Sequence, residues 1–198
     1  MRTGGVAGVI DLRGGTVEEL RYRAGDLVVV SGLPGAGKST LMRRVVGPGV
    51  HRVDSQDTRR RIERRVPRRL PYAAYRPAAR LAHYAALWRA LRSGHSVVVH
   101  DCGQWGWVRR WLAREARRRG RRLHVVMLVV DAAQARAGQR ARGRGVPPRS
   151  FARHRRAMRR LVTDAEAGRA PRGAASATLL DRGAADALRA LTFGGSAP

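Results

Sequence analysis

Eight consecutive residues, Gly-Leu-Pro-Gly-Ala-Gly-Lys-Ser, have the types and spacing of a loop that binds phosphate groups. Gly32, Gly35 and Gly37 let backbone N–H groups approach phosphate oxygens, because no side chain lies in the way. Lys38 is the only lysine among the 41 lysines and arginines, and its compact ammonium suits contact with the β- and γ-phosphates of a nucleotide. The octet, which ends at Ser39, therefore predicts a nucleotide-phosphate site.

The segments on either side of the octet are those that a P-loop requires. The apolar run at 26–31 predicts a buried strand, and residues 40–46 predict the start of a helix. That helix would direct its unpaired N–H groups at the phosphates. The Ser39 hydroxyl is the expected Mg²⁺ ligand, and Thr40 is the less suited one. The expected nucleotide-binding residues are Gly32, Gly35, Ala36, Gly37, Lys38, Ser39 and Thr40.

Alternating strands and helices are predicted along the rest of the chain. Continuous apolar runs are typical of central parallel strands, and right-handed crossovers between them place helices on both faces. The fold class is therefore α/β, a single domain with a five-stranded parallel sheet. Strands are expected at 27–31, 50–53, 96–101, 124–130 and 177–180. One helix is expected to begin at about residue 40, and another is expected to end at residue 91. The other helices are expected at 57–65, 105–119, 132–142, 150–167 and 184–191.

Composition and length suit one domain without membrane contact. A chain of 198 residues that is 43% hydrophobic can bury one good core. We expect an N-terminal extension at 1–24 with at most a helical turn near 16–22, the domain at 25–193, and a flexible tail at 194–198. No apolar run reaches the length of a membrane span, and the first residues lack the apolar core of a secretory signal. The expected location is the cytoplasm.

The formal net charge of +27 makes nucleic acid an admissible partner, since clustered arginines bind phosphates. The alternative is a set of solvated basic helix faces, because the arginines are spread along the whole chain. Trp105, Trp107 and Trp111 lie beside arginines and could stack on nucleobases. The four-residue spacing of the last two fits core packing better. Leu81, Tyr84, Trp88 and Leu91, on one face of the helix that ends near residue 91, are also expected in the core.

Asp101 follows the apolar run at 96–100 and stands at the carboxyl end of the predicted strand. Ligands of α/β proteins bind beyond that end of the sheet, where P-loop enzymes use an acid to support the Mg²⁺ ion. Asp101 is therefore the expected second metal residue, and an N-cap for the next helix is the structural alternative.

Four segments resemble those of small P-loop kinases related to polynucleotide 5′-hydroxyl kinases and zeta-toxin-like kinases, ATP-binding proteins of the AAA type. They are residues 32–40, 54–60, 97–101 and 139–147, and the resemblance spans residues 26–181. It implies ATP and Mg²⁺ as cofactors. It also implies an acid that activates the acceptor hydroxyl, a nearby arginine that holds the acceptor's phosphate, and lid arginines that neutralise the transferring phosphoryl group.

The segment after the second strand, with sequence DSQDTRR, departs from that family pattern. Aligning Arg59 with the family's arginine places Gln56 at the position of the base, and glutamine cannot accept a proton. Three alternatives follow: Asp57 paired with Arg60, Asp54 reaching in from the strand end, or a loss of this chemistry. We take Asp57 as the base and Arg59 as a catalytic arginine. The structural alternative for Asp57 is a first-turn acid of the following helix.

Arg136, Arg140 and Arg144 recur at four-residue spacing, and Gly143 and Gly145 interrupt the helix where a mobile lid would need to bend. Arg140 and Arg144 are the expected lid arginines, because a planar guanidinium suits a phosphoryl group whose charge spreads over several oxygens. A solvated basic helix face is the alternative.

These features together predict an ATP- and Mg²⁺-dependent P-loop phosphotransferase with Lys38, Asp57, Arg59, Arg140 and Arg144 as catalytic residues. Its acceptor is a hydroxyl group, with a nucleic-acid 5′-hydroxyl favoured and a nucleoside or nucleotide-sugar as the alternative. A nucleotide-binding ATPase or regulatory protein that phosphorylates no acceptor is the second class of function, and Gln56 is the residue that favours it.

Overall fold

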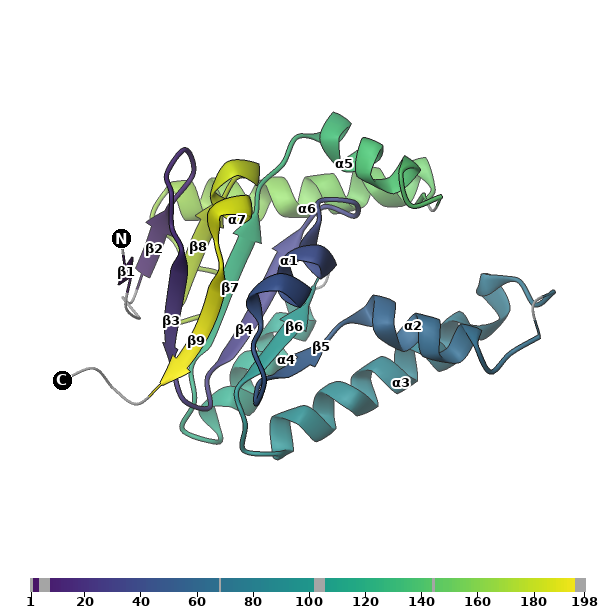
Figure 1. The fold of residues 1–198 in the computed structure, drawn as a ribbon, viewed down its shortest axis with the longest axis horizontal. Coiled ribbons are helices and arrows are strands. Elements are labelled where there is room, and N and C mark those ends of the chain that lie inside the picture. The colour runs from purple at the N-terminus through teal and green to yellow at the C-terminus, as the bar shows by residue number, and fades with distance from the viewer. Residues whose placement is uncertain (1, 4–7, 68, 102–105, 144, 195–198) are drawn as a thin grey trace.

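The central element is a parallel sheet of six strands, in the order β2-β8-β7-β4-β6-β5 (Figure 1). The computed structural model describes residues 2–3, 8–67, 69–101, 106–143 and 145–194. The strands are β2 (Gly8–Asp11), β4 (Leu27–Gly32), β5 (His51–Val53), β6 (Val97–His100), β7 (Leu123–Leu128) and β8 (Ser176–Leu180). Every pair is parallel, so the α/β class is confirmed. The sheet has six strands rather than the expected five, because β2 adds an edge strand beside β8.

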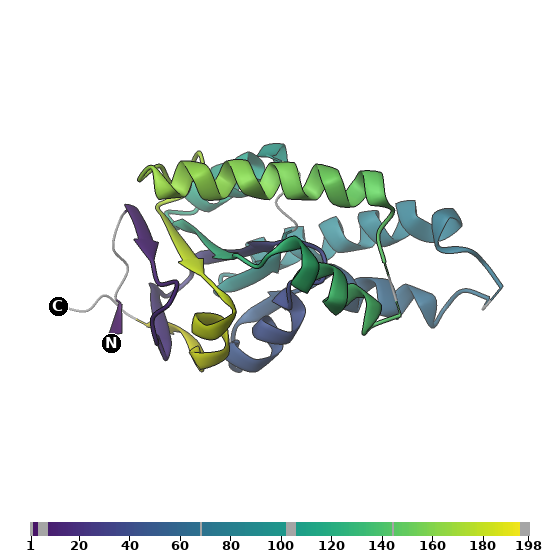
Figure 2. The same cartoon turned by 90° about the horizontal axis from the view of Figure 1, so that it is seen from above.

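Helices cover both faces of the sheet, as expected. They are α1 (Lys38–Val45), α2 (Ser55–Glu63), α3 (Tyr72–Arg92), α4 (Gly106–Arg117), α5 (Ala132–Arg140), α6 (Pro148–Glu166) and α7 (Arg182–Ala187). In Figure 2, α4 and α6 lie on one face and α1 and α7 on the other, while α2 and α3 extend beyond β5. No helix in the part of the chain that the structure describes combines the length and the apolar character needed to cross a membrane.

A second, smaller parallel sheet has the order β1-β3-β9, with β1 (Arg2–Thr3), β3 (Glu19–Arg23) and β9 (Ala190–Gly194). The expected helical turn near 16–22 is wrong, because β3 alternates polar and apolar residues and buries Leu20 and Tyr22. The expected last helix is also too long, since α7 ends at Ala187. Residues 1–24 thus supply strands to both sheets, Gly194 belongs to β9, and residues 195–198 lie outside the described residues.

The buried face of α3 differs from the expected one. Leu81 is 72% exposed and Trp88 is 48% exposed, so the prediction that both lie in the core is wrong. Leu91 is buried and Tyr84 packs against the core, as predicted, whereas Tyr75 and Leu87 are buried without having been predicted. Apolar residues surround α3 on all sides, and its packing against β5 and β6 decides which of them are covered.

A buried polar cluster joins the amino ends of three strands. His124 on β7 contacts Asp26 Oδ2 through Nε2 at 3.1 Å and Ser176 Oγ through Nδ1 at 2.8 Å. Burial raises the pKa of Asp26, but hydrogen bonds from His124 and from the Arg122 N–H outweigh it, so the net pKa is lowered. All three side chains are at most 3% exposed, which leaves no room for a substrate. This Ser-His-Asp cluster therefore holds strands together.

Candidate active site

The phosphate loop connects β4 to α1, and α1 begins at Lys38, close to the expected start. Gly35 and Gly37 have φ values of +90° and +100°, a region that side chains rarely adopt. Lys38 and Ser39 are buried, whereas Thr40 is exposed. Lys38 Nζ donates hydrogen bonds to the carbonyl oxygens of Gly32 at 2.7 Å and Leu33 at 2.8 Å. The ammonium is therefore held over the loop, where a bound phosphate chain would meet it.

Helix α5 packs directly on the phosphate loop. A Cβ atom on Gly35 would overlap the carbonyl oxygen of Ala135, and one on Gly138 would overlap the carbonyl oxygen of Gly35. Gln139 fastens this contact, since its Nε2 donates to Pro34 O at 3.0 Å and its Oε1 accepts from Val146 N at 2.8 Å. Sequence reasoning missed this contact, although a glycine inside a helix is a signal of close packing.

The carboxyl end of β5 places an acid beside the next strand. Asp54 is 2% exposed, and its Oδ1 caps α2 by accepting a hydrogen bond from Gln56 N at 2.8 Å. Its Oδ2 is buried and has no hydrogen-bond partner among the described residues. His100, at the end of β6, lies 2.9 Å from Ser55 Oγ and 3.9 Å from Asp54 Oδ1, both measured from its Nδ1. The helix cap thus gives Oδ1 of Asp54 a hydrogen bond, whereas Oδ2 is buried without one among the described residues.

Charge interactions join this acid to the phosphate loop. Burial holds the pKa of His100 well below its usual value, and the positive charges of Lys38, His83 and Arg142 lower it further. Burial also lowers the pKa of His83, against the opposing effect of Asp54 and Asp101. His100 is consequently neutral at pH 7. The sequence alone did not indicate either histidine, because only the sheet order brings them beside Lys38.

Asp101 stands just after β6, as expected, and is 9% exposed. Arg109 on α4 contacts its Oδ2 through Nη1 at 3.1 Å. Residues 102–105, which include Trp105, lie outside the described residues. The sequence did not single out Arg109, the ion-pair partner of Asp101.

The donors at this edge fit a magnesium ion. Mg²⁺ usually takes one or two protein oxygens and completes its shell with waters and substrate phosphates. The Ser39 hydroxyl and the Asp101 carboxylate are donors of this hard-oxygen type. No group of three or more acidic, histidine or cysteine side chains able to hold a metal occurs in the described ranges. A Mg²⁺ ion here would therefore depend on the nucleotide's phosphates for most of its ligands.

The expected base and its arginine, Asp57 and Arg59, each carry an ion pair. Asp57 is paired with Arg52 Nη2 at 3.1 Å. Arg59 is paired with Glu63 at 2.8 Å, and the Tyr75 hydroxyl also contacts Glu63.

The expected lid arginines do not lie along one continuous helix, because α5 ends at Arg140. Arg140 is the last residue of α5, is exposed, and lines a cavity of about 550 Å³ together with Arg136. Arg142, in the turn after α5, reaches α1, where its Nη2 lies 3.4 Å from Thr40 Oγ1. Arg144 lies outside the described residues. The four-residue spacing missed Arg142 because the helix ends before that residue.

A family model and one solved structure support the fold. A family model described as an AAA domain matches residues 27–161. A candidate kinase from Chloroflexus aurantiacus has a TM-score of 0.54 at 16% identity, over 78% of this chain and 87% of that one. A protein of the PezAT toxin–antitoxin system of Streptococcus pneumoniae gives 0.48 at 12% identity, over 60% of this chain and 52% of that one.

The tunicamycin resistance protein of Deinococcus radiodurans gives a TM-score of 0.42 at 16% identity, over 69% of this chain and 80% of its own. This chain thus spans about half the length of the Streptococcus structure and most of the other two. A search of curated proteins found no match.

Proposed function

This chain belongs to the family of AAA domains, and on that premise we propose that it transfers the γ-phosphoryl group of ATP to a hydroxyl acceptor. The support is a formed phosphate loop together with the buried carboxylate of Asp54, one oxygen of which has no hydrogen-bond partner among the described residues. Capping of α2 uses only Oδ1 of Asp54, so the proposal rests on the second oxygen, Oδ2. The acceptor we favour is the 5′-hydroxyl of a nucleic acid, and a nucleoside or nucleotide-sugar hydroxyl is the alternative.

The reaction would proceed as a direct displacement. The acceptor oxygen bonds to the γ-phosphorus, the bond between that phosphorus and the β–γ bridging oxygen breaks, and ADP leaves with the electron pair. The hydroxyl proton passes to a carboxylate of this chain. Lys38 holds the β- and γ-phosphates, while Arg142 and Arg140 neutralise charge on the transferring group. Arg144, which lies outside the described residues, keeps the same role that the sequence predicts for it. Ser39 and Asp101 would hold a Mg²⁺ ion, which would supply positive charge to offset the negative charge of the phosphates.

The observation that carries the proposal is the unpaired Oδ2 of Asp54. Leaving a buried carboxylate oxygen without a partner costs free energy, about 1 to 3 kcal/mol for a typical polar group, so an incoming hydroxyl would gain by bonding to it. Asp57, our expectation from the sequence, carries an ion pair with Arg52 that would have to open first. We therefore place Asp54 first and Asp57 second as the proton acceptor.

A transfer assay with labelled γ-phosphate tests the proposal. The acceptors are 5′-hydroxyl DNA, 5′-hydroxyl RNA, nucleosides and nucleotide-sugars, each with Mg²⁺ and with Lys38→Ala as the blank. Asp54→Asn should abolish transfer but keep the α2 cap, because asparagine also caps helices. Asp57→Asn is the matched control and should retain most activity.

Three outcomes would change this assignment. Full activity of Asp54→Asn together with loss in Asp57→Asn would make Asp57 the base. Label on a nucleoside or nucleotide-sugar alone would establish the small-molecule kinase. Release of free phosphate with no labelled acceptor would instead identify an ATPase, the function that Gln56 favours.

A further inference from the structure

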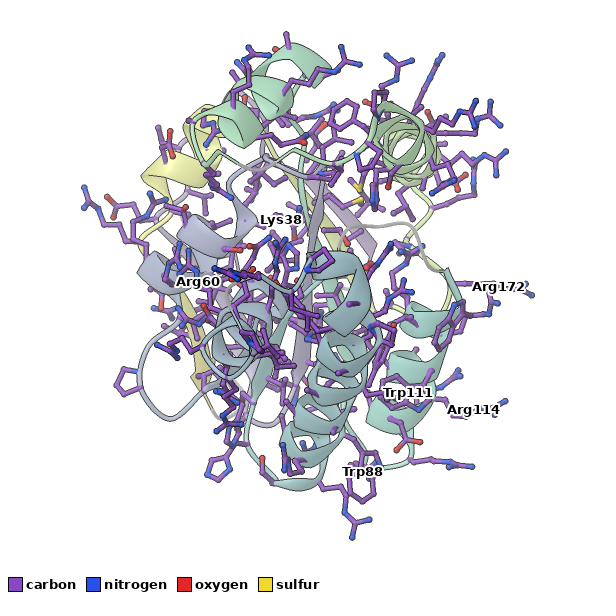
Figure 3. The ribbon with its side chains drawn as sticks, turned by 90° about the vertical axis from the view of Figure 1, so that its right-hand side faces the viewer. Lys38, Arg60, Trp88, Trp111, Arg114 and Arg172 are labelled. Atoms are coloured by element: carbon purple, nitrogen blue, oxygen red, sulfur yellow. The ribbon has the colours of Figure 1, made fainter. Side chains whose placement is uncertain are left out.

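We propose that the outer surface of α4, together with the loop before β8, binds a single strand of nucleic acid. This binding does not depend on the proposed phosphotransfer. The surface is a groove of about 440 Å³, here called the α4 groove. The lining residues that matter are Trp107, Arg110, Trp111, Arg114, Arg117 and Arg172. In Figure 3, Trp111, Arg114 and Arg172 lie together on the right, whereas Lys38 and Arg60 lie to the left.

The groove is built by close packing of two segments. Helix α4 buries Val108, Leu112 and Ala113 against the sheet, so its tryptophans and remaining arginines face outward. Gly173 brings the loop before β8 onto this helix, since a Cβ atom there would lie 2.7 Å from Ala113 Cβ, and its φ is +84°. This close approach sets Arg172 across from the arginines of α4. The groove is therefore a fixed feature of the packed domain.

The two tryptophans offer surface on which bases can stack. Trp107 is 51% exposed, so the expectation that it packs in the core is wrong. Trp111 is only partly buried and packs against the core, so it still contributes a wall of the groove. Exposing half of an indole leaves apolar area in water, and a stacked base would cover it. Stacking requires an unpaired base, which favours a single strand over a duplex.

The charge of the groove is uncompensated. No ion pair joins Arg110, Arg114 or Arg172 to any carboxylate of the described residues. Neighbouring arginines are paired: Arg109 of α4 with Asp101, and Arg118 and Arg119, which follow α4, with Glu115. A row of free guanidinium groups beside aromatic rings is the arrangement that binds a phosphate chain and its bases.

The length of the row favours a chain of phosphates over a single small anion. From Arg110 to Arg117 the helix rises about 10 Å, at 1.5 Å per residue. Arg172 then adds a cation from the facing loop. One phosphate group cannot contact arginines spread over that length, whereas successive phosphates of one strand can.

The test is fluorescence anisotropy of the full chain with a labelled oligothymidylate of about 12 nucleotides, without ATP. Arg110→Ala/Arg114→Ala should weaken binding and reduce the slope of log affinity against log salt by about 1.4, since each lost phosphate contact removes about 0.7. Arg110→Lys/Arg114→Lys should retain most of that slope. Arg155→Ala/Arg159→Ala, on the exposed face of α6, removes the same charge and should change the slope much less.

The tryptophans provide a second readout. Trp107→Ala should weaken binding about fivefold or more, because one stacking contact is lost. Trp88→Ala is the matched control: it is 48% exposed and lies outside the groove, with Arg92 over its ring at 4.5 Å, and it should bind normally. Lys38→Ala should also bind normally.

Three results would overturn the inference. Equal losses in the two arginine-to-alanine double variants would mean that net charge alone attracts the strand. Equal affinity for a duplex of the same length, or an unchanged affinity in Trp107→Ala, would exclude stacking in the α4 groove. Loss of binding in Lys38→Ala would place the strand at the phosphate loop instead.

Discussion

Replacing Gly138 by alanine should destabilise this protein, although the same change normally stabilises a helix. Gly138 lies inside α5 and has an ordinary helical backbone, so alanine there would gain about 1 kcal/mol from helix propensity alone. The new Cβ, however, would overlap the carbonyl oxygen of Gly35 and lie 3.3 Å from its carbonyl carbon. The contact is with backbone of the phosphate loop, which cannot move aside as a flexible side chain can.

The magnitude follows from these two opposing terms. Overpacking of this kind costs about 1 to 3 kcal/mol, and overlap with backbone falls at the upper end. Against the gain in propensity, we expect Gly138→Ala to lower the free energy of unfolding by about 2 kcal/mol. Displacement of α5 from the phosphate loop should also weaken nucleotide binding.

Urea denaturation, with and without ATP, measures both effects. Gly145→Ala is the matched control, because it lies in the same lid and the nearest atom to its new Cβ is 3.8 Å away. That variant should unfold like the wild type. A Gly138→Ala protein more stable than the wild type, with unchanged nucleotide affinity, would refute the direct packing of α5 on the phosphate loop.

Three further predictions concern the phosphate loop, the buried cluster and α3. Lys38→Ala should lose most of the stabilisation that ATP gives, which for the wild type is about 2.7 kcal/mol at a hundred times Kd; thermal unfolding with and without ATP measures it. The lowered pKa of Asp26 means that its stabilisation is full above the unfolded-state pKa near 3.9 and is lost as pH falls through the folded-state value. Asp26→Asn should therefore be less stable at pH 7 and lose less stability on acidification, as urea midpoints at pH 3 to 7 would show. On α3, Leu87→Ala should cost about 2 to 5 kcal/mol because the side chain is 1% exposed, whereas Leu81→Ala should stay within about 0.5 kcal/mol. Equal losses in calorimetry would mean that both side chains are buried.

The phosphate loop could be predicted in full because its parts are contiguous. Strand, glycine turn and helix follow one another in the sequence, and the interactions that shape them span only a few residues. The apolar runs of β4, β6 and β7 could likewise be recognised as strands from the sequence, since strands covered on both faces must be apolar throughout. The α/β class followed from their alternation with helices.

What the sequence left open depends on contacts between distant segments. β2 joins the sheet only because Ser176–Leu180 offers it an edge, and α3 turns Leu87 inward because β5 and β6 lie on that side. The site also depends on contacts between distant segments. Asp54 comes from the end of β5, His100 from the end of β6, and Arg142 from the turn after α5. The sequence by itself determined where phosphate would bind, because a local backbone conformation is sufficient for that. Only the tertiary structure decided which acid and which arginines surround that loop, because the order of strands in the sheet and the packing of α5 bring them there.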